Sequence, residues 1–140
     1  MAEGILRKKT KEVGLRWVID SAGTNGFHIG EAPHYQSQKV AKKNGIDISK
    51  QIAKKFVKED FDKFDKIYAM ADDVLDEIKT ISQEKFDNKK AILLLHELYP
   101  EKNLNVPDPW YGPEKGFYEV FELIEKACEK IIENYTIAIS

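Results

Sequence analysis

The stretch Lys66–Leu95, KIYAMADDVLDEIKTISQEKFDNKKAILLL, decides the fold of this chain. Its first residues, Lys66–Met70, have the composition of a short strand, and Ala91–Leu95 is a near-continuous apolar run, typical of a strand that is buried on both faces. Between them, Asp72–Ile81 carries its apolar residues at helical spacing. The stretch therefore predicts a strand, a helix and a second strand.

The same alternation of element types continues outward from this unit. Helices are predicted at Ala2–Glu12, at about His34–Asn44 and at about Glu114–Asn134, and a further strand is predicted at Leu15–Ile19. Strands that alternate with helices form a parallel sheet covered by helices on both faces. Because the chain has 140 residues, 42% of them hydrophobic, we expect one α/β domain over residues 1–140.

The charge and hydropathy of the chain argue against several classes of function. Its 22 basic and 24 acidic residues give a formal net charge of -2, so the total charge makes no case for binding nucleic acid or an anionic membrane. No apolar run approaches the ~18 residues that span a bilayer, and the N-terminal residues lack the features of a signal peptide. A cytoplasmic location is therefore expected.

Neither the single cysteine nor the histidines indicate a metal site. Cys128 lies in a stretch with helical periodicity, so we interpret it as a buried structural thiol. The three histidines are well separated and match no ligand spacing. No metal and no cofactor are expected.

Two loops carry the residue types from which a site could be built. They have the sequences DSAGTNGFHIG (residues 20–30) and HELYPEKNLNVPDPWYG (residues 96–112), and each follows a predicted strand. Parallel sheets bind ligands at the carboxyl ends of their strands, so both loops are expected at one rim. Asp108 is held between two prolines, which suits an acid–base group but equally suits a turn residue.

Four segments of the chain, WVIDSAGTNGFHIGEAP, GIDIS, DFDKFDKIYAM and VPDPWYG, resemble the low molecular weight protein tyrosine phosphatases, and the resemblance runs from Ala2 to about Glu133. It implies a three-layer fold, with a parallel sheet between two layers of helices. It also implies hydrolysis of phosphotyrosine in a protein, or of a small phosphomonoester, without a metal or cofactor.

The same resemblance assigns roles to particular residues. Asp108 matches the general acid that protonates the leaving phenolate, and Trp110 and Tyr111 match the aromatic wall beside the substrate's ring. Phe27 would lie on the opposite wall, and Ser21 matches a hydroxyl that braces the phosphate-binding loop.

One part of the family pattern is missing from this sequence. The family has a first strand and a Cys-x5-Arg loop ahead of a helix that begins like AEGIL, whereas no Cys-x5-Arg occurs in these 140 residues. The nucleophile and the phosphate clamp are then both absent, and we expect the chain as given to be inactive. A milder departure is Ala71, which stands where the family often has an acid.

Three explanations for this departure remain open. The chain is a shortened form of a complete phosphatase, or it is an inactive relative that binds a phosphoprotein or another partner. A relationship to the arsenate reductases, which share the fold, is the weakest of the three, because their mechanism uses several cysteines and only Cys128 is present.

The end of the chain, NYTIAIS at Asn134–Ser140, suggests how a lost first strand could be replaced. In the family that strand lies between the segments corresponding to Leu15–Ile19 and Lys66–Met70. The C-terminal residues are rich in Tyr, Thr and Ile, so we expect them to form a strand in the vacant position. The alternatives are a frayed tail, or a second chain that fills the position in a homodimer.

Overall fold

The centre of the molecule is a strand–helix–strand unit. The structure is a computed structural model that describes residues 1–24, 35–51, 54–100, 102–107 and 114–136. Strands β1 (Ile67–Ala69) and β2 (Ala91–Leu93) are parallel, with Ile67 opposite Ala91. Helix α4 (Asp72–Ser82) connects them and packs on both. The unit predicted from residues 66–95 is therefore confirmed, with shorter strands than expected.

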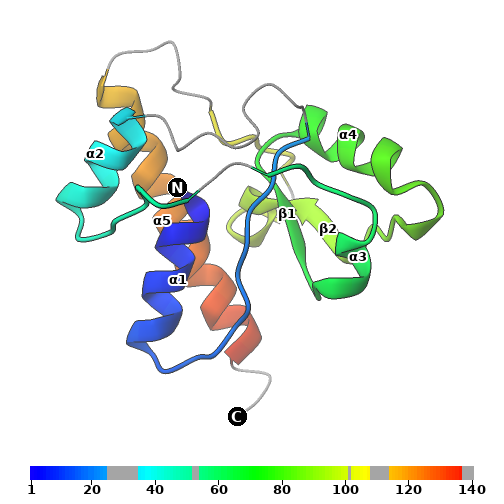
Figure 1. The fold of residues 1–140 in the computed structure, drawn as a ribbon, viewed down its shortest axis with the longest axis horizontal. Helices are drawn as coiled ribbons and strands as arrows, with labels where there is room; N and C mark the ends of the chain where they lie inside the picture. Colours follow the sequence, from blue (N-terminus) through cyan, green and yellow to red (C-terminus); the bar gives the residue numbers. More distant parts are fainter. Residues whose placement is uncertain (25–34, 52–53, 101, 108–113, 137–140) are drawn as a thin grey trace.

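Helices cover this sheet on both sides (Figure 1). One layer consists of α1 (Ala2–Glu12), α2 (Tyr35–Lys43) and α5 (Glu114–Thr136), in which α1 and α2 both pack against α5. The other layer holds α4. The described chain also contains the short helix α3 (Asp60–Lys63) and the 3-10 turns η1 (Gln83–Lys85) and η2 (Leu94–Glu97).

Alternation along β1 produces this layering. Tyr68 packs against the core of α1, α2 and α5, whereas Ile67 and Ala69 belong to a second apolar cluster under α4. Successive side chains of a strand point to opposite faces, so a strand with apolar residues at every position must be covered on both. The predicted three-layer α/β fold is confirmed.

The segment Leu15–Ile19 does not form the predicted strand. In the described part of the chain no backbone ladder joins it to a neighbour. The segment that follows makes one isolated parallel bridge, between Gly23 and Lys55. Apolar content favours a strand only where a partner strand supplies hydrogen bonds. Val18 accordingly remains 84% exposed.

The C-terminal strand prediction is wrong for the first three residues of the tail. Residues 134–136 form the last turn of α5, which is two residues longer than the helix predicted from the sequence. Two of these residues are held by side-chain bonds to Glu97 of η2, from Asn134 Nδ2 at 2.7 Å and from the Tyr135 hydroxyl at 3.0 Å. These bonds favour continuation of the helix over a strand. The rest of the tail, residues 137–140, lies outside the described residues.

Candidate functional site

The segment that leads into VPDPWYG is fixed to the carboxyl end of β1. Val106 N donates to Met70 O at 2.7 Å, directly after the strand, and the Val106 side chain is buried. One residue earlier, Asn105 Oδ1 accepts from Asp72 N at 2.9 Å, and Asn105 Nδ2 donates to Asp72 Oδ1 at 3.2 Å. The first turn of α4 and the start of this loop are therefore joined.

Asn105 supplies a helix cap that the local sequence lacks. The N-cap residue of α4 is Ala71, whose side chain cannot accept a hydrogen bond. Helix N-termini leave backbone donors without partners, and these are satisfied by capping oxygens. The Asn105 side chain fills this role from a distant part of the chain.

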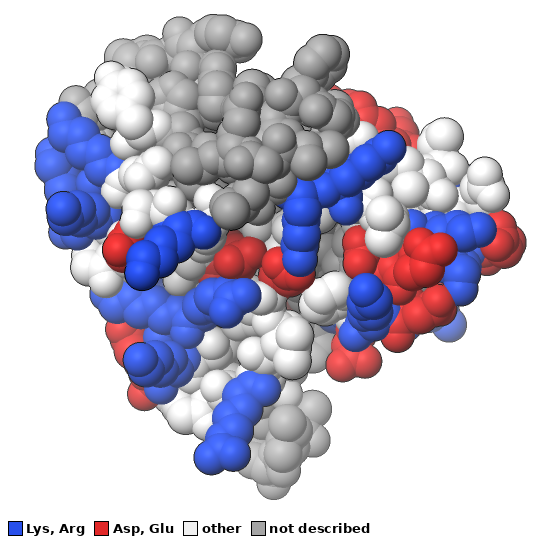
Figure 2. Space-filling view, in the orientation of Figure 1, with Lys and Arg blue, Asp and Glu red and all other residues white. Residues whose placement is uncertain are grey.

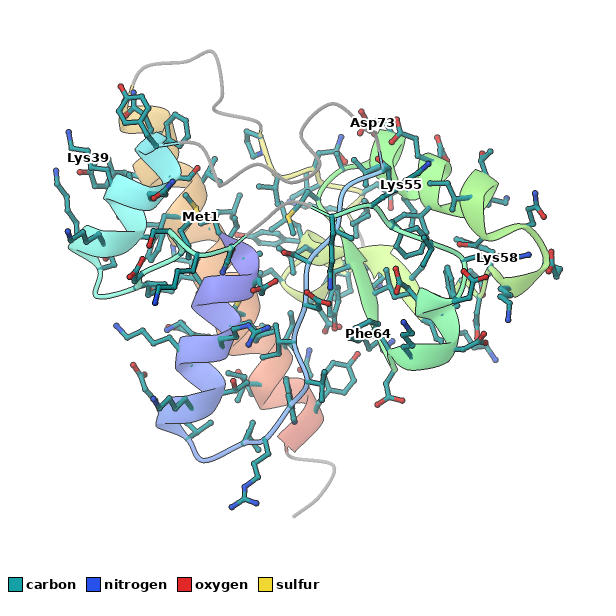
Figure 3. All side chains as sticks on the ribbon, in the orientation of Figure 1. Met1, Lys39, Lys55, Lys58, Phe64 and Asp73 are labelled. Atoms are coloured by element: carbon teal, nitrogen blue, oxygen red, sulfur yellow. The ribbon has the colours of Figure 1, made fainter. Side chains whose placement is uncertain are left out.

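The flank of the other candidate loop also contacts α4. Thr24 Oγ1 donates to the Glu77 carboxylate, and the Gly23 backbone bonds on both sides to residues 54 and 56 at 2.8 Å. Figure 3 draws Lys55, the bridge partner of Gly23, and Asp73 of α4 at the same end of the molecule. The described flanks of both loops thus converge on α4, as the shared-rim prediction requires.

Ser21 is the one predicted site residue that the structure describes. Its Oγ donates to Glu3 Oε1 at 2.8 Å, and the same carboxylate pairs with Arg7 Nε at 3.2 Å. Arg7 also donates to the Ile19 carbonyl. Ser21 is therefore held by the first turns of α1. The sequence analysis missed Glu3 and Arg7, although their separation of four residues on a helix was a usable signal.

Asp20, next to Ser21, is kept ionised by its neighbours. Partial burial acts to raise the pKa of Asp20, but hydrogen bonds from the Lys54 ammonium and the Ser21 amide outweigh this and lower the pKa from its ordinary value. The Asp20–Lys54 pair ties the 21–24 segment to the 54–56 segment. This carboxylate is structural, because its charge is already paired.

Cys128 has no nucleophilic character in this structure. It is 1% exposed on the inner face of α5, and burial raises the pKa of its thiol to about 12. The attacking form of a cysteine is the thiolate, which this environment disfavours. The prediction of a buried structural thiol is confirmed.

The four remaining predicted site residues, Asp108, Trp110, Tyr111 and Phe27, lie outside the described residues, so their roles stay predictions. Within the described residues, no group of three or more His, Cys, Asp or Glu side chains is placed to hold a metal ion. No helix in the same part of the chain is long and apolar enough to cross a membrane.

Asn105→Ala tests the joint between this loop and α4. The substitution removes the side-chain amide whose oxygen accepts the hydrogen bond from Asp72 N. The free energy of unfolding should fall by about 1 kcal/mol and the thermal midpoint by about 3 °C. Amide exchange at Asp72 and Val106 should accelerate together. Asn103→Ala, in the same exposed segment, is the matched control and should leave both measurements unchanged. Equal effects of the two variants would contradict the capping role.

A parallel α/β sheet between two helical layers, with loops converging beyond the end of β1, is the architecture of a family of phosphatases. The family described as low molecular weight phosphotyrosine protein phosphatase matches residues 1–137. The chain belongs to this family.

Individual relatives agree with this assignment. The low molecular weight phosphotyrosine protein phosphatase of Gallus gallus is 38% identical over 136 residues, which cover 96% of this chain and 85% of that protein. The corresponding values for low molecular weight protein-tyrosine-phosphatase YfkJ of Bacillus subtilis are 34% over 137 residues, 96% and 85%. A crystal structure of a protein tyrosine phosphatase from Entamoeba histolytica superposes with a TM-score of 0.88 at 32% identity, covering 99% of this chain and 89% of that one.

Proposed function

We propose that this chain is a protein tyrosine phosphatase domain and that its 140 residues, which contain no Cys-x5-Arg segment, do not turn over substrate. The absence of Cys-x5-Arg carries the proposed inactivity, and the observation that carries the position of the site is the bond from Val106 N to Met70 O. It fixes the start of the VPDPWYG loop at the carboxyl end of β1, where parallel sheets place their ligand sites.

In the reaction that we propose for the complete form, which includes a Cys-x5-Arg loop, the thiolate of that loop attacks the phosphorus of a phosphotyrosine, in a protein or as a small phosphomonoester. The bond from phosphorus to the phenolate oxygen breaks, and water then hydrolyses the cysteinyl phosphate. Asp108 protonates the leaving phenolate, which would otherwise depart as a poor, charged leaving group. Trp110, Tyr111 and Phe27 contact the substrate's ring. Ser21 braces the phosphate-binding loop. The proposal includes no metal and no cofactor.

The nucleophile is the part of the mechanism that this sequence does not supply. The one cysteine, Cys128, is buried as a thiol, and no Cys-x5-Arg segment occurs. Loss of one member of a nucleophilic constellation commonly lowers the rate by about 10³ to 10⁶. Here the thiolate and the bidentate arginine are missing together, so a general acid has no step to assist.

The purified 140-residue chain is therefore expected to hydrolyse para-nitrophenyl phosphate no faster than a buffer blank. The measurement is the absorbance of the nitrophenolate released over time. The matched sample is the same chain with Asp108→Ala. Turnover that disappears in that variant would overturn the proposal of inactivity, because it would require a nucleophile other than a Cys-x5-Arg thiolate.

A second candidate function is that of an inactive relative that binds a phosphoprotein. The absence of Cys-x5-Arg from the sequence also fits this function. The DNA ahead of the first codon separates the two, since an in-frame Cys-x5-Arg segment supports the complete enzyme. In either case we propose a cytoplasmic protein, and a homodimer remains a proposal for its assembly.

A further inference from the structure

The charges of this molecule are segregated, although its net charge is only -2. Residues 1–55 contain eleven basic and five acidic residues, whereas residues 56–140 contain eleven basic and nineteen acidic residues. Figure 2 shows mainly Lys and Arg among the charged residues over the α1–α2 side of the molecule, whereas Asp and Glu lie interspersed with Lys over the α3–α4 side. The α1–α2 side can therefore be basic although the net charge of the chain is slightly negative.

Five lysines form one patch on the first side, which we call the α1–α2 basic face: Lys8, Lys11, Lys42, Lys43 and Lys50. Lys8 Nζ donates to Asn44 O at 2.9 Å, which joins the middle of α1 to the turn after α2. Lys11 lies one turn further along α1. Hydrogen bonds from Ser49 and, more weakly, the charges of Lys50 and Lys42 lower the pKa of Asp47, so each of these two lysines faces the Asp47 turn.

The positive charge on this face is poorly compensated. In the described part of the chain, Lys11, Lys42 and Lys50 form no salt bridge. Lys43 donates to the neutral hydroxyl of Tyr118, and the carboxylate paired with Lys8 is 3.9 Å away, on Glu12. Asp47, an acid in the turn after α2, already accepts hydrogen bonds from Ser49, at 2.6 Å from Oγ and 2.9 Å from N.

Some lysines elsewhere on the molecule are held by short ion pairs. Lys9, on the buried side of α1, bonds Glu129 at 2.8 Å and lies 3.8 Å from Glu125, both on α5. Lys85 pairs with Asp62 at 2.5 Å. Intramolecular ion pairs account for Lys9 and Lys85, whereas no such pair in the described part of the chain holds Lys11, Lys42 or Lys50.

We propose that the α1–α2 basic face is a docking surface for an acidic segment of a partner protein. Complementary charge steers encounter and fixes register between proteins. The five cations are lysines, which act as flexible point charges and suit carboxylates along an extended peptide, whereas nucleic-acid and phosphate recognition favours the planar guanidinium of Arg. Binding of an acidic segment at this face does not rest on the proposed phosphatase function.

Fluorescence anisotropy with a labelled peptide of about twelve alternating Glu and Gly residues, free of phosphotyrosine, tests the proposal. Binding should be measurable at about 20 mM salt and weaken at about 150 mM, because exposed charges are screened. Lys42→Glu with Lys50→Glu should weaken binding by about tenfold or more. Lys63→Glu with Lys89→Glu makes the same change in net charge on other elements, and should alter binding by less than about twofold. Neither control lysine forms a salt bridge in the described part of the chain.

Each other outcome overturns the proposal. If both double variants lose the same affinity for the peptide, the peptide is attracted by the net charge of the protein and not by a defined face. If a single-stranded DNA of equal charge binds more tightly than the peptide, and the Lys42/Lys50 variant loses that binding, the face recognises nucleic acid. Self-association of the protein alone, abolished by the same variant, would assign it to a second copy. Since the assay involves neither phosphotyrosine nor turnover, its result is independent of whether the proposed phosphatase function holds.

Discussion

Asp108→Ala is expected to lower phosphatase activity by about 10² to 10⁴ when it is introduced into a chain extended ahead of Ala2 by a strand and a Cys-x5-Arg loop. The extension supplies the thiolate and the arginine, and the rate then depends on protonation of the leaving group. A positioned general acid contributes an effect of this size because proton transfer avoids an unstable phenolate. The measurement is kcat/KM for para-nitrophenyl phosphate.

Two comparisons separate this role from a structural one. With 2,4-dinitrophenyl phosphate, whose leaving group is a weak base, the effect of Asp108→Ala should shrink towards unity, because little proton donation is needed. Asp65→Ala, which removes an exposed carboxylate before β1, should leave both rates unchanged. A loss that is the same for both substrates would show that Asp108 acts through folding or binding, and the assigned role would fail.

The parts of the fold that were predicted correctly depend on local pattern. Ile67–Ala69 forms a strand that is covered on both sides, because each of its residues is apolar or aromatic and alternate ones must face opposite layers. The helices α1 and α5 follow from periodic apolar residues, which pack against each other. Such patterns are visible within a dozen residues of sequence.

The failures depend on contacts between distant residues. Leu15–Ile19 has strand composition, but composition does not reveal whether a partner strand runs beside it. Likewise, the tail was expected as a strand, and the bonds that continue α5 instead reach from Tyr135 to Glu97. In the candidate site, too, local sequence predicts some features and distant contacts determine others. Its loops were recognisable by composition and resemblance, whereas the support of Ser21 by Glu3 required the packing of α1.

Glu97 itself is an unexpected feature, a carboxylate only 8% exposed that has no basic partner in the described part of the chain. It accepts hydrogen bonds from the Tyr68 hydroxyl at 2.7 Å, from the Tyr135 hydroxyl at 3.0 Å and from Asn134 Nδ2 at 2.7 Å. These three donors come from β1 and from the end of α5. The carboxylate thus joins the sheet to the last turn of the longest helix.

The Tyr68 donor remains protonated over a wide pH range. Burial, followed by the bond to Glu97, raises the pKa of the Tyr68 phenol above its ordinary value of about 10. A group whose pKa is raised on folding contributes stability that is complete below its unfolded pKa and is lost as the pH rises through its folded pKa. The Tyr68 contribution is therefore complete at neutral pH and declines only above about pH 10.

Glu97→Ala is expected to lower the free energy of unfolding by about 3 to 5 kcal/mol. The substitution leaves three partly buried donors without their acceptor, and each such group costs about 1 to 3 kcal/mol, reduced where water reaches it. Urea unfolding at neutral pH, followed by circular dichroism, measures the loss. Glu97→Gln retains a carbonyl for the tyrosines and loses only the favourable oxygen at Asn134, so about 1 to 2 kcal/mol is expected for it. If the Gln variant is as unstable as the Ala variant, the negative charge itself stabilises the fold. If both variants are as stable as the parent chain, the hydrogen bonds to Glu97 contribute nothing to stability.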